Sequence, residues 1–579
     1  MHLLDQAPDL YFFLTYTPHD PFTLFKNENG EWNARRERKG KIEVLHSEAS
    51  VEHECKSWLA SLDLEKIEIL YVYGIGVGKI YDHLKPWLKN ESQRRLIFLE
   101  DDLGVLSAFS KTEICAEILE DPQVVVRYVQ NWDSELESLA QTFPYAEIEV
   151  TALPFYAKRH KQRLSRIRLT LLRNTSSYHA LFSEALFSHK LLGNLSVNLR
   201  KLPSSFYANE MKGRYAGIPA IICGAGPSLK PALKALKGLE NRALILAGGS
   251  TIAALSNNGV LPHLSMALDP NPEELQRLEA ASAFEIPLLF ASRLNSDVFS
   301  TCNGPLGYLK SDTGGVFETW MEERLSIAGE AVGPDLGREA FSVTTLAAAF
   351  AYLLGCNPII FVGVDLAYTG MKRYADGIMT QNALDLFALK NDKRATDRLV
   401  RRKDRQGKTI YTLVKWVMES ECLSAYAKAH PDRTFLNATE GGIGFSEIPY
   451  APLEKIIERY CTCTWDLRAK IHVDTQVLQM RTLSEARIDS LYEQLRLSLR
   501  RSLNLCEEII DELSHPTAKK IVLELDFQEE TAYKPLLEMP LLALDRLLER
   551  YIHQTDVERE KIKWLRMKEI IESQMQTLS

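Results

Sequence analysis

The stretch IPAIICGAGPSLKPALKALKG, residues 218–238, predicts a buried strand that ends in two glycines and runs directly into a helix. Gly224 and Gly226 leave space for a ligand or a helix to approach. Pro227 suits the first turn of the helix, and Ser228 can donate a hydroxyl group. Free N–H groups and the helix dipole favour a bound phosphate at such a turn. Alone, the pattern fits a phosphate site and a tight turn equally well.

The strand before this turn is expected to belong to a set of six, and the other five follow it in the sequence. Six apolar segments show little polar alternation, which is typical of parallel strands that are covered on both faces. They read IPAIICGAG, RALILAGG, LSMALD, IPLLFAS, LGYLKS and NPIIFVGVD. Helical patterns separate several of them, so residues 216–460 are predicted to form a central α/β domain.

Small and polar residues follow several of these strands. The set comprises Gly248, Ser250, Thr251, Asp269, Gly363, Asp365, Asn437, Thr439, Glu440 and Gly441, with Tyr368 and Tyr374 close behind Asp365. Parallel strands place their carboxyl ends at one edge of the sheet, where ligands bind. One such residue could cap a turn, as Asp269 would before Pro270, and each tyrosine could be a packing residue. The whole set at one edge is better explained by a site.

The first 150 residues are expected to form a second, Rossmann-like domain. The stretch IEILYVYGIGVGKIYDHLKPWL gives a strand, three alternating glycines at Gly74, Gly76 and Gly78, and a helix. RRLIFLEDD predicts the next strand and ends on acidic residues beginning with Glu100. This pattern is similar to a nucleotide or S-adenosylmethionine site. We favour a scaffold kept for structure or acceptor binding, without a cofactor.

Two helical regions complete the expected α/β architecture of two parallel-sheet domains and a helical tail. Residues 151–215 are basic and helical, and we interpret them as a connector. Residues 461–579 lack the glycines of the preceding domains and carry apolar residues at three- and four-residue spacing. One amphipathic helix stops at His515–Pro516, and two more fit residues 533–553 and 556–577. The tail is an antiparallel bundle or an element that joins copies of the chain.

Composition narrows the class of protein. The 579 residues are 45% hydrophobic and 25% charged, with a net charge of −8, which argues against a general nucleic-acid or anionic-membrane binder. No apolar run approaches the roughly 20 residues that span a bilayer, and the N-terminus does not resemble a signal peptide. The nine scattered cysteines are expected to be reduced and mostly buried, as in a cytoplasmic protein.

Five motifs occur in order: GAGPSLK from Gly224, LDP from Leu268, FSVTTLAAAFAYLLGCNPIIFVGVDLAYT from Phe341, YADG from Tyr374 and NATEGG from Asn437. With them the chain resembles the motility accessory factor family of flagellin glycosyltransferases. A broader group that shares this domain is described as 6-hydroxymethylpterin diphosphokinase-like. The resemblance covers about 218–455 and, in layout, the first 200 residues.

The same domain is similar to bacterial sialyltransferases that use CMP-sugars. Their GxGPSL loop and a Gly-x-Asp followed by two tyrosines match Gly224–Ser228, Gly363, Asp365, Tyr368 and Tyr374. The resemblance implies that Gly224, Ala225, Gly226, Pro227 and Ser228 hold the nucleotide. It also implies that the two tyrosines stabilise the departing CMP phosphate without a metal, a role that phenol O–H donors can perform.

The chain departs from the sialyltransferase pattern at three positions. Ala225 replaces an asparagine of the loop, AGGST lacks the asparagine expected at the next strand end, and no histidine follows Tyr374 before His430. The base is then expected among Asp365, Asp404 and Glu440. The basic stretch 401–407 is expected to be a solvated loop, or else to meet donor phosphate or carboxylate through Arg401, Arg402 or Lys403.

Three functions follow from these expectations. The first is a cytoplasmic glycosyltransferase that moves a sialic-acid-like sugar from CMP to a Ser or Thr hydroxyl of a flagellin-like protein, with no metal or other cofactor. The second is a pyrophosphokinase acting on a pterin-like alcohol with ATP and Mg²⁺, held by Asp269 and Asp365. The third is a degenerate, non-catalytic nucleotide-binding protein.

Overall fold

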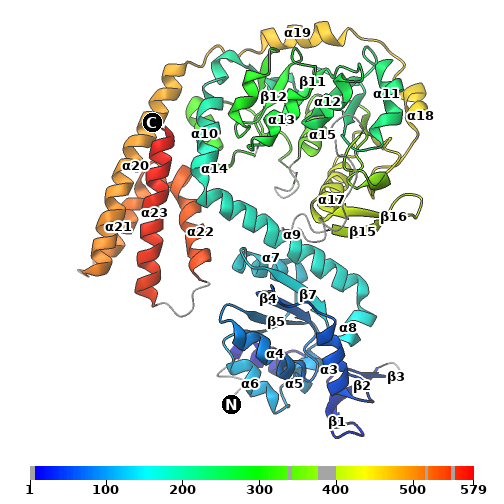
Figure 1. Ribbon diagram of the computed structural model, residues 1–579, viewed down its shortest axis with the longest axis vertical. Helices are drawn as coiled ribbons and strands as arrows, with labels where there is room; N and C mark the ends of the chain where they lie inside the picture. The colour runs from blue at the N-terminus through cyan, green and yellow to red at the C-terminus, as the bar shows by residue number, and fades with distance from the viewer. Residues whose placement is uncertain are drawn as a thin grey trace. The chain divides into compact units, whose positions relative to one another are not determined.

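The computed structural model divides the chain into two compact units (Figure 1). The structure describes residues 7–38, 40–311, 313–334, 336, 342–375, 399–515, 519–549 and 555–578. One unit comprises Met1–Leu181 with Asp545–Arg559, and the other comprises Phe182–Leu544 with Glu560–Ser579. The division falls inside helix α9 (Lys161–Leu186), within the expected connector.

The first unit begins with a small antiparallel sheet. It consists of β1 (Thr23–Lys26), β2 (Trp32–Arg38) and β3 (Lys41–Val44), paired in that order. The turn signal Asn29–Gly30 joins β1 to β2, and Gly30 takes the positive φ of +75° that glycine adopts without strain.

A four-stranded parallel sheet forms the body of this unit. Its strands are β4 (Ile69–Tyr73), β5 (Arg95–Glu100), β6 (Val124–Tyr128) and β7 (Ile148–Ala152), in the order β6-β5-β4-β7. This is the order of one half of a Rossmann fold, so the predicted Rossmann-like parallel sheet is confirmed. Every residue of β4 is buried, because helices cover both faces of the sheet.

The second unit is built on an eight-stranded sheet in which every pairing is parallel. Its order is β17-β14-β9-β10-β11-β12-β13-β8. In sequence order the strands are β8 (Phe206–Tyr207), β9 (Ala220–Cys223), β10 (Leu244–Gly248), β11 (Leu264–Ala267), β12 (Leu288–Phe290), β13 (Leu306–Tyr308), β14 (Ile359–Val362) and β17 (Phe435–Asn437). All six predicted strands are present.

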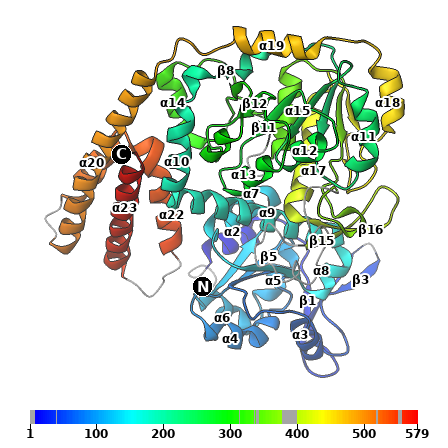
Figure 2. The same cartoon turned by 45° about the horizontal axis from the view of Figure 1, so that its top comes forward.

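Two layers of helices bury this sheet (Figures 1 and 2). One face packs against α10 (Ser188–Leu199), α11 (Leu229–Lys237), α12 (Ser250–Ser256), α13 (Glu273–Glu279), α14 (Gly315–Leu325) and α18 (Leu453–Tyr460). The other packs against α15 (Val343–Leu353), α17 (Val414–Ala429) and α19 (Leu467–Val477). Ile221 lies in the first core and Ile222 in the second, which explains why the strands lack polar alternation.

The C-terminal segment is helical, as predicted. Its helices are α20 (Glu485–Ser514), α21 (Lys520–Glu529), α22 (Glu538–Leu548) and α23 (Asp556–Leu578). Trp564 of α23 is buried, with its ring edge-on to that of Phe527 at 5.1 Å, so α21 and α23 share a core. Figure 1 shows α20, α21 and α23 side by side, in agreement with the Phe527–Trp564 contact. The end of the helix expected at 533–553 lies outside the described residues.

The prediction of a solvated loop at residues 401–407 is wrong in part. Strands β15 (Leu399–Lys403) and β16 (Thr409–Leu413) form an antiparallel hairpin, and the turn between them contains Gly407 with a φ of +80°. The alternating sequence TIYTL accounts for β16, because Ile410 and Thr412 are buried while Thr409 is exposed.

All nine cysteines are free, and six of them are buried. Among the helices that the structure describes, none has the length and the apolar composition needed to cross a membrane.

Candidate functional site

The predicted site residues gather at the carboxyl edge of the eight-stranded sheet, around neighbouring strands β9 and β14. The chain leaves β9 through α11 toward β10, on one side. It leaves β14 through the β15–β16 hairpin and α17 toward β17, on the other side. Connections that diverge in this way create a crevice outside the strand ends, where α/β proteins bind ligands.

The glycines of the opening motif allow the β9 and β14 loops to touch. The Gly224 amide donates to the Val362 carbonyl at 2.8 Å, and the Gly226 amide donates to the Gly363 carbonyl at 2.9 Å. A Cβ on Gly224 would lie 2.5 Å from the Gly363 oxygen, and one on Gly226 would lie 2.2 Å from Asp365 Oδ1. Both positions therefore need glycine for contact between loops, whether or not a ligand binds.

Asp365 connects three loops at this edge. Its Oδ2 accepts hydrogen bonds from the Ser228 hydroxyl at 2.9 Å and from the Ser228 amide at 3.3 Å. The Gly441 amide donates to the same Ser228 hydroxyl at 2.9 Å, and the Ile443 amide donates to the Asp365 carbonyl at 3.1 Å. The loops after β9, β14 and β17 are thus joined through one carboxylate.

The Asp365 carboxylate is nearly inaccessible to solvent. Burial raises its pKa above the ordinary value, while the polar groups of Thr369 and Ser228 oppose the shift. Its Oδ1 is buried beside Gly226 and has no hydrogen-bond partner among the described residues. We interpret Asp365 as a residue that positions the loop of Ser228.

The loop after β17 uses two of its predicted residues to hold its own shape. The Thr439 amide donates to Asn437 Oδ1 at 2.9 Å, and the Thr439 hydroxyl accepts from the Val364 amide at 3.1 Å. Glu440 is exposed next to the buried Thr439. Asn437 and Thr439 therefore connect this loop to β14, and Glu440 is the residue of the three whose side chain is open to solvent.

The residues after β10 and β11 lie farther along the same edge. Gly248 has no room for a Cβ, which would lie 2.0 Å from Val343 at the start of α15. Ser250 begins α12, and Thr251 is buried within it. Asp269 accepts from the Asn271 amide at 3.0 Å, as a turn cap does, and pairs with Arg277 at 3.0 Å.

Glu274 at this edge was not predicted. Arg277 bridges it to Asp269, with a 2.7 Å contact to Glu274 Oε2. Glu274 is 1% exposed, burial raises its pKa, and its Oε1 has no hydrogen-bond partner among the described residues. A glutamate that follows PNP in sequence gives no signal of burial, which results from the packing of α13.

The two tyrosines occupy different environments. Tyr368 is 6% exposed, and its ring meets that of Trp416 edge-on at 4.8 Å. Tyr374 precedes Ala375, whose amide donates to the Ala225 carbonyl at 2.8 Å. Tyr374 is therefore attached to the glycine loop, whereas Tyr368 is part of the packing between the β14 loop and α17.

Asp404 was expected as a base, and Asp269 and Asp365 were expected as Mg²⁺ ligands. Their positions in the structure limit these roles. Asp404 lies in the hairpin turn, where its Oδ1 accepts from the amides of Gln406 and Lys408 at 2.9 and 2.8 Å. Asp269 and Asp365 follow strands three positions apart, a separation of about 14 Å at the strand ends. Across the described part of the chain, no three His, Cys, Asp or Glu side chains are grouped to hold a metal ion. The shared Mg²⁺ site expected from Asp269 and Asp365 does not fit this arrangement.

The first unit has an equivalent crevice between β4 and β7, and its own side chains fill it. A Cβ on Gly74 would lie 2.3 Å from the Tyr156 ring, and one on Gly76 would lie 2.2 Å from His46 Nε2. The Val77 amide donates to His46 Nε2 at 3.2 Å, so the opposite ring nitrogen carries the hydrogen that Glu54 accepts at 2.8 Å.

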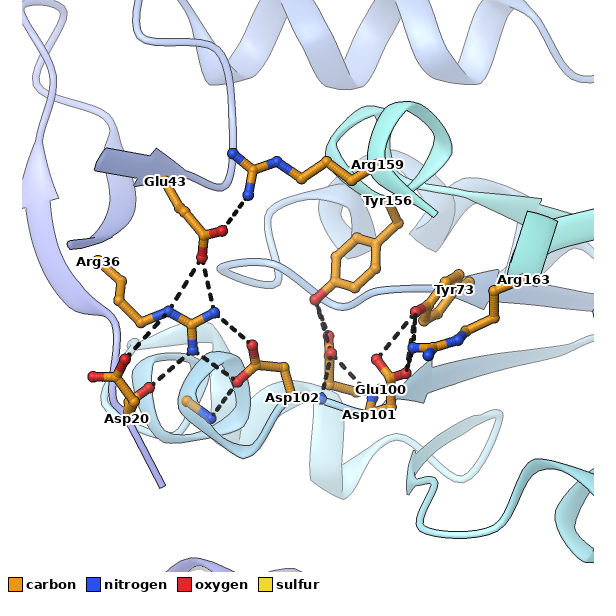
Figure 3. Close-up of polar contacts among 11 residues, drawn as sticks. Asp20, Arg36, Glu43, Tyr73, Glu100, Asp101, Asp102, Tyr156, Arg159 and Arg163 are labelled. Carbon is orange, nitrogen blue, oxygen red and sulfur yellow. Dashed lines mark hydrogen bonds and ion pairs between the residues drawn. The ribbon is translucent and has the colours of Figure 1, made fainter. Parts of the chain in front are cut away.

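Glu100, the last residue of β5, is also bonded within the unit (Figure 3). It accepts from the Tyr156 hydroxyl at 2.6 Å and from the Ile75 amide of the glycine loop at 3.2 Å. Burial raises its pKa to about 8, although hydrogen bonds from Tyr156 and backbone amides oppose the shift. Glu100 thus accepts the hydrogen bond of a loop amide. In a nucleotide-binding Rossmann fold, an amide at this position would bind a phosphate.

Arg36 holds the small antiparallel sheet beside this network (Figure 3). Its guanidinium pairs with Glu43 at 2.9 Å and with Asp102 at 2.8 Å, while Asp20 lies at 3.9 Å. Arg159 reaches Glu43, and Arg163 reaches Asp101 next to Tyr73. The carboxyl edge of β5 is therefore closed by ion pairs within the unit.

Comparison with known proteins finds one family model that matches part of the central domain and one solved structure that resembles the whole chain. Residues 191–371 match the family model described as "6-hydroxymethylpterin diphosphokinase MptE-like", which confirms the expected relation of this stretch. No match to a curated protein sequence was found. The chain is similar in structure to a MAf glycosyltransferase from Magnetospirillum magneticum AMB-1, with a TM-score of 0.52 and 15% identity over 100% of this chain and 94% of that one. At this identity the likeness establishes a shared fold.

Replacing Ser228 tests the connection between the three loops. We expect Ser228→Ala to lower the free energy of unfolding by about 1–3 kcal/mol, because it removes a bond to a buried carboxylate and leaves the Gly441 amide without its acceptor. Urea denaturation measures the change. Ser300→Ala is the control, since that exposed hydroxyl bonds only the nearby Asp297 carbonyl. Equal stability of the two variants would contradict the role of Ser228.

Glu100 predicts a pH effect on the first unit. Its folded pKa of about 8 exceeds its ordinary value of 4.5, so its contribution to stability is complete at low pH and is lost as pH rises through 8. Glu100→Gln cannot titrate. We therefore expect the Tm of this variant, relative to the wild type, to rise by several degrees between pH 5 and 9 in calorimetry. A difference in Tm that stays constant with pH would refute this assignment.

Proposed function

We propose that the chain is a glycosyltransferase that moves a sugar from a nucleotide donor to a protein hydroxyl. The observation that carries this proposal is the attachment of Tyr374 to the glycine loop, through the 2.8 Å bond between Ala375 and Ala225. This bond holds the backbone next to Tyr374 at a strand-to-helix turn in the crevice of a parallel sheet, where phosphates bind. The whole-length fold likeness to a MAf glycosyltransferase supports the same class of reaction.

In the proposed reaction, the Gly224–Ser228 loop and the residues after β10 hold the nucleotide. The donor is a CMP-linked, sialic-acid-like sugar, and the acceptor is a Ser or Thr hydroxyl of a flagellin-like protein. The Tyr374 hydroxyl donates a hydrogen bond to the phosphate as the bond to the sugar breaks, which lowers the barrier to departure. Asp365 acts on the loop rather than on the substrate.

Glu440 is the most suitable of the three expected bases. It is exposed on the loop that Gly441 joins to Ser228, whereas Asp365 bonds Ser228 and Asp404 caps the hairpin turn. An exposed carboxylate can accept the proton of an incoming hydroxyl.

A second function rests on the family match at residues 191–371. A pyrophosphokinase would use ATP and Mg²⁺ and act on a pterin-like alcohol. The separation of Asp269 from Asp365 by three strand spacings means that such an enzyme would hold its Mg²⁺ through the ATP phosphates and other groups.

A nucleotide panel distinguishes the two functions. We expect CMP to raise the Tm without Mg²⁺, and UDP and ATP to raise it less, since a ligand that binds only the folded state stabilises it. Thermal shift assays with CMP, CDP, UDP and ATP, with and without Mg²⁺, make the comparison. Stabilisation by ATP only when Mg²⁺ is present would favour the pyrophosphokinase. No shift with any nucleotide would favour a non-catalytic role.

Tyr374→Phe tests the leaving-group role. We expect kcat to fall about 100-fold with little change in KM, because the hydroxyl acts only as charge develops on the phosphate. The measurement is steady-state release of CMP from the donor. Tyr352→Phe is the control, since that hydroxyl faces Asp432 near the far end of α15. A fall in kcat matched by an equal weakening of donor binding would argue against this role for Tyr374.

A further inference from the structure

The β15–β16 hairpin is strongly basic in a chain whose net charge is −8. Between residues 399 and 413 it carries a single acidic residue, Asp404, which caps the turn. The basic residues of this segment are Arg401, Arg402, Lys403, Arg405 and Lys408. Such a local excess of positive charge attracts anions.

The base of this hairpin is bonded to the loop that follows β14. The Tyr368 amide donates to the Tyr411 carbonyl at 2.9 Å, and the Thr412 hydroxyl donates to the Leu366 carbonyl at 2.6 Å. Leu366 directly follows Asp365, the residue that holds Ser228. The hairpin therefore extends from the same loop that forms one side of the proposed donor crevice.

The two faces of the hairpin differ in their surroundings. Arg402 is paired across the strands with Ile410, and Arg401 is paired with Tyr411. Because side chains alternate along a strand, Arg402 lies on the face of Ile410 and Thr412, which are both buried against the protein. Arg401 lies on the opposite face and is exposed, whereas Arg402 is partly buried.

Arg402 has no counter-charge within the described chain. It forms no ion pair or side-chain hydrogen bond with any residue in the described ranges. The neighbouring Lys403 differs, since its ammonium donates to the Thr409 hydroxyl at 3.1 Å on the outer face. A partly buried guanidinium has lost some of its hydration, so an anion that accepts its paired N–H groups would be bound strongly.

We propose that Arg402 binds an anionic oxygen group of the donor, either its phosphate or the carboxylate of its sugar. This inference rests on the proposed function and adds a residue that selects an anionic donor. The Thr412 hydroxyl is not required to contact the donor, because it already donates to the Leu366 carbonyl.

The test compares Arg402→Gln with Arg401→Gln, which removes the same charge from the outer face. Isothermal titration measures binding of pyrophosphate, CMP and CMP-N-acetylneuraminate to the full-length chain. We expect Arg402→Gln to weaken binding about tenfold or more, as loss of a charged hydrogen bond does, and Arg401→Gln to change it little. Arg402→Lys keeps the charge without the fork and should give an intermediate affinity. Far-ultraviolet circular dichroism and Tm verify that each variant is folded.

The outcomes distinguish which group Arg402 binds, whether Arg402 binds the donor at all, and whether the proposed function holds. Equal weakening for CMP and CMP-N-acetylneuraminate identifies the phosphate as the bound group, and weakening for CMP-N-acetylneuraminate alone identifies the carboxylate. Unchanged affinity of folded Arg402→Gln for every probe that binds the wild type overturns the inference. If neither nucleotide binds the wild type, the proposed function fails. Pyrophosphate then decides the role of Arg402, since Arg402-dependent binding supports it and independent or undetectable binding overturns it.

Discussion

The candidate site depends on the hydrogen bonds between the Asp365 carboxylate and Ser228. A buried carboxylate is costly unless donors compensate for its lost hydration, and here the compensating donors belong to a loop from another strand. The bond works only because Gly224, Gly226 and Gly363 let the two loops approach within hydrogen-bonding distance. Through the Gly441 amide the same interaction also sets the loop after β17.

Both parallel sheets have a glycine-rich loop after a central strand, but different groups contact the two loops. In each, a strand ends in alternating glycines at the point where neighbouring connections diverge. In the first unit, Tyr156 and His46 cover the glycines, and Glu100 and His46 accept hydrogen bonds from the loop amides. The interpretation of that unit as a scaffold stays a prediction. In the second unit the glycines face the β14 loop, and Tyr374 is attached beside them.

Much of the architecture could be predicted because its signals are local. The apolar strands of both sheets, the Asn29–Gly30 turn and the end of α20 near His515 all depend on residues adjacent in sequence. Strand β8 has two residues, too few for any periodicity to be recognised. The hairpin was missed because its five cations suggested solvent, although the alternation in TIYTL indicated a strand with one buried face.

The sequence by itself determined which residue types stand at the strand ends, since a glycine pair before a helix and acidic or hydroxyl residues after apolar strands can be read from neighbouring letters. The tertiary structure decided what those residues do. Ser228 and Asp365 are 137 positions apart, and Tyr156 is 56 positions from Glu100. Whether a carboxylate binds a ligand or holds a loop depends on which donors surround it and how far it is buried. Both are set by the packing of distant segments.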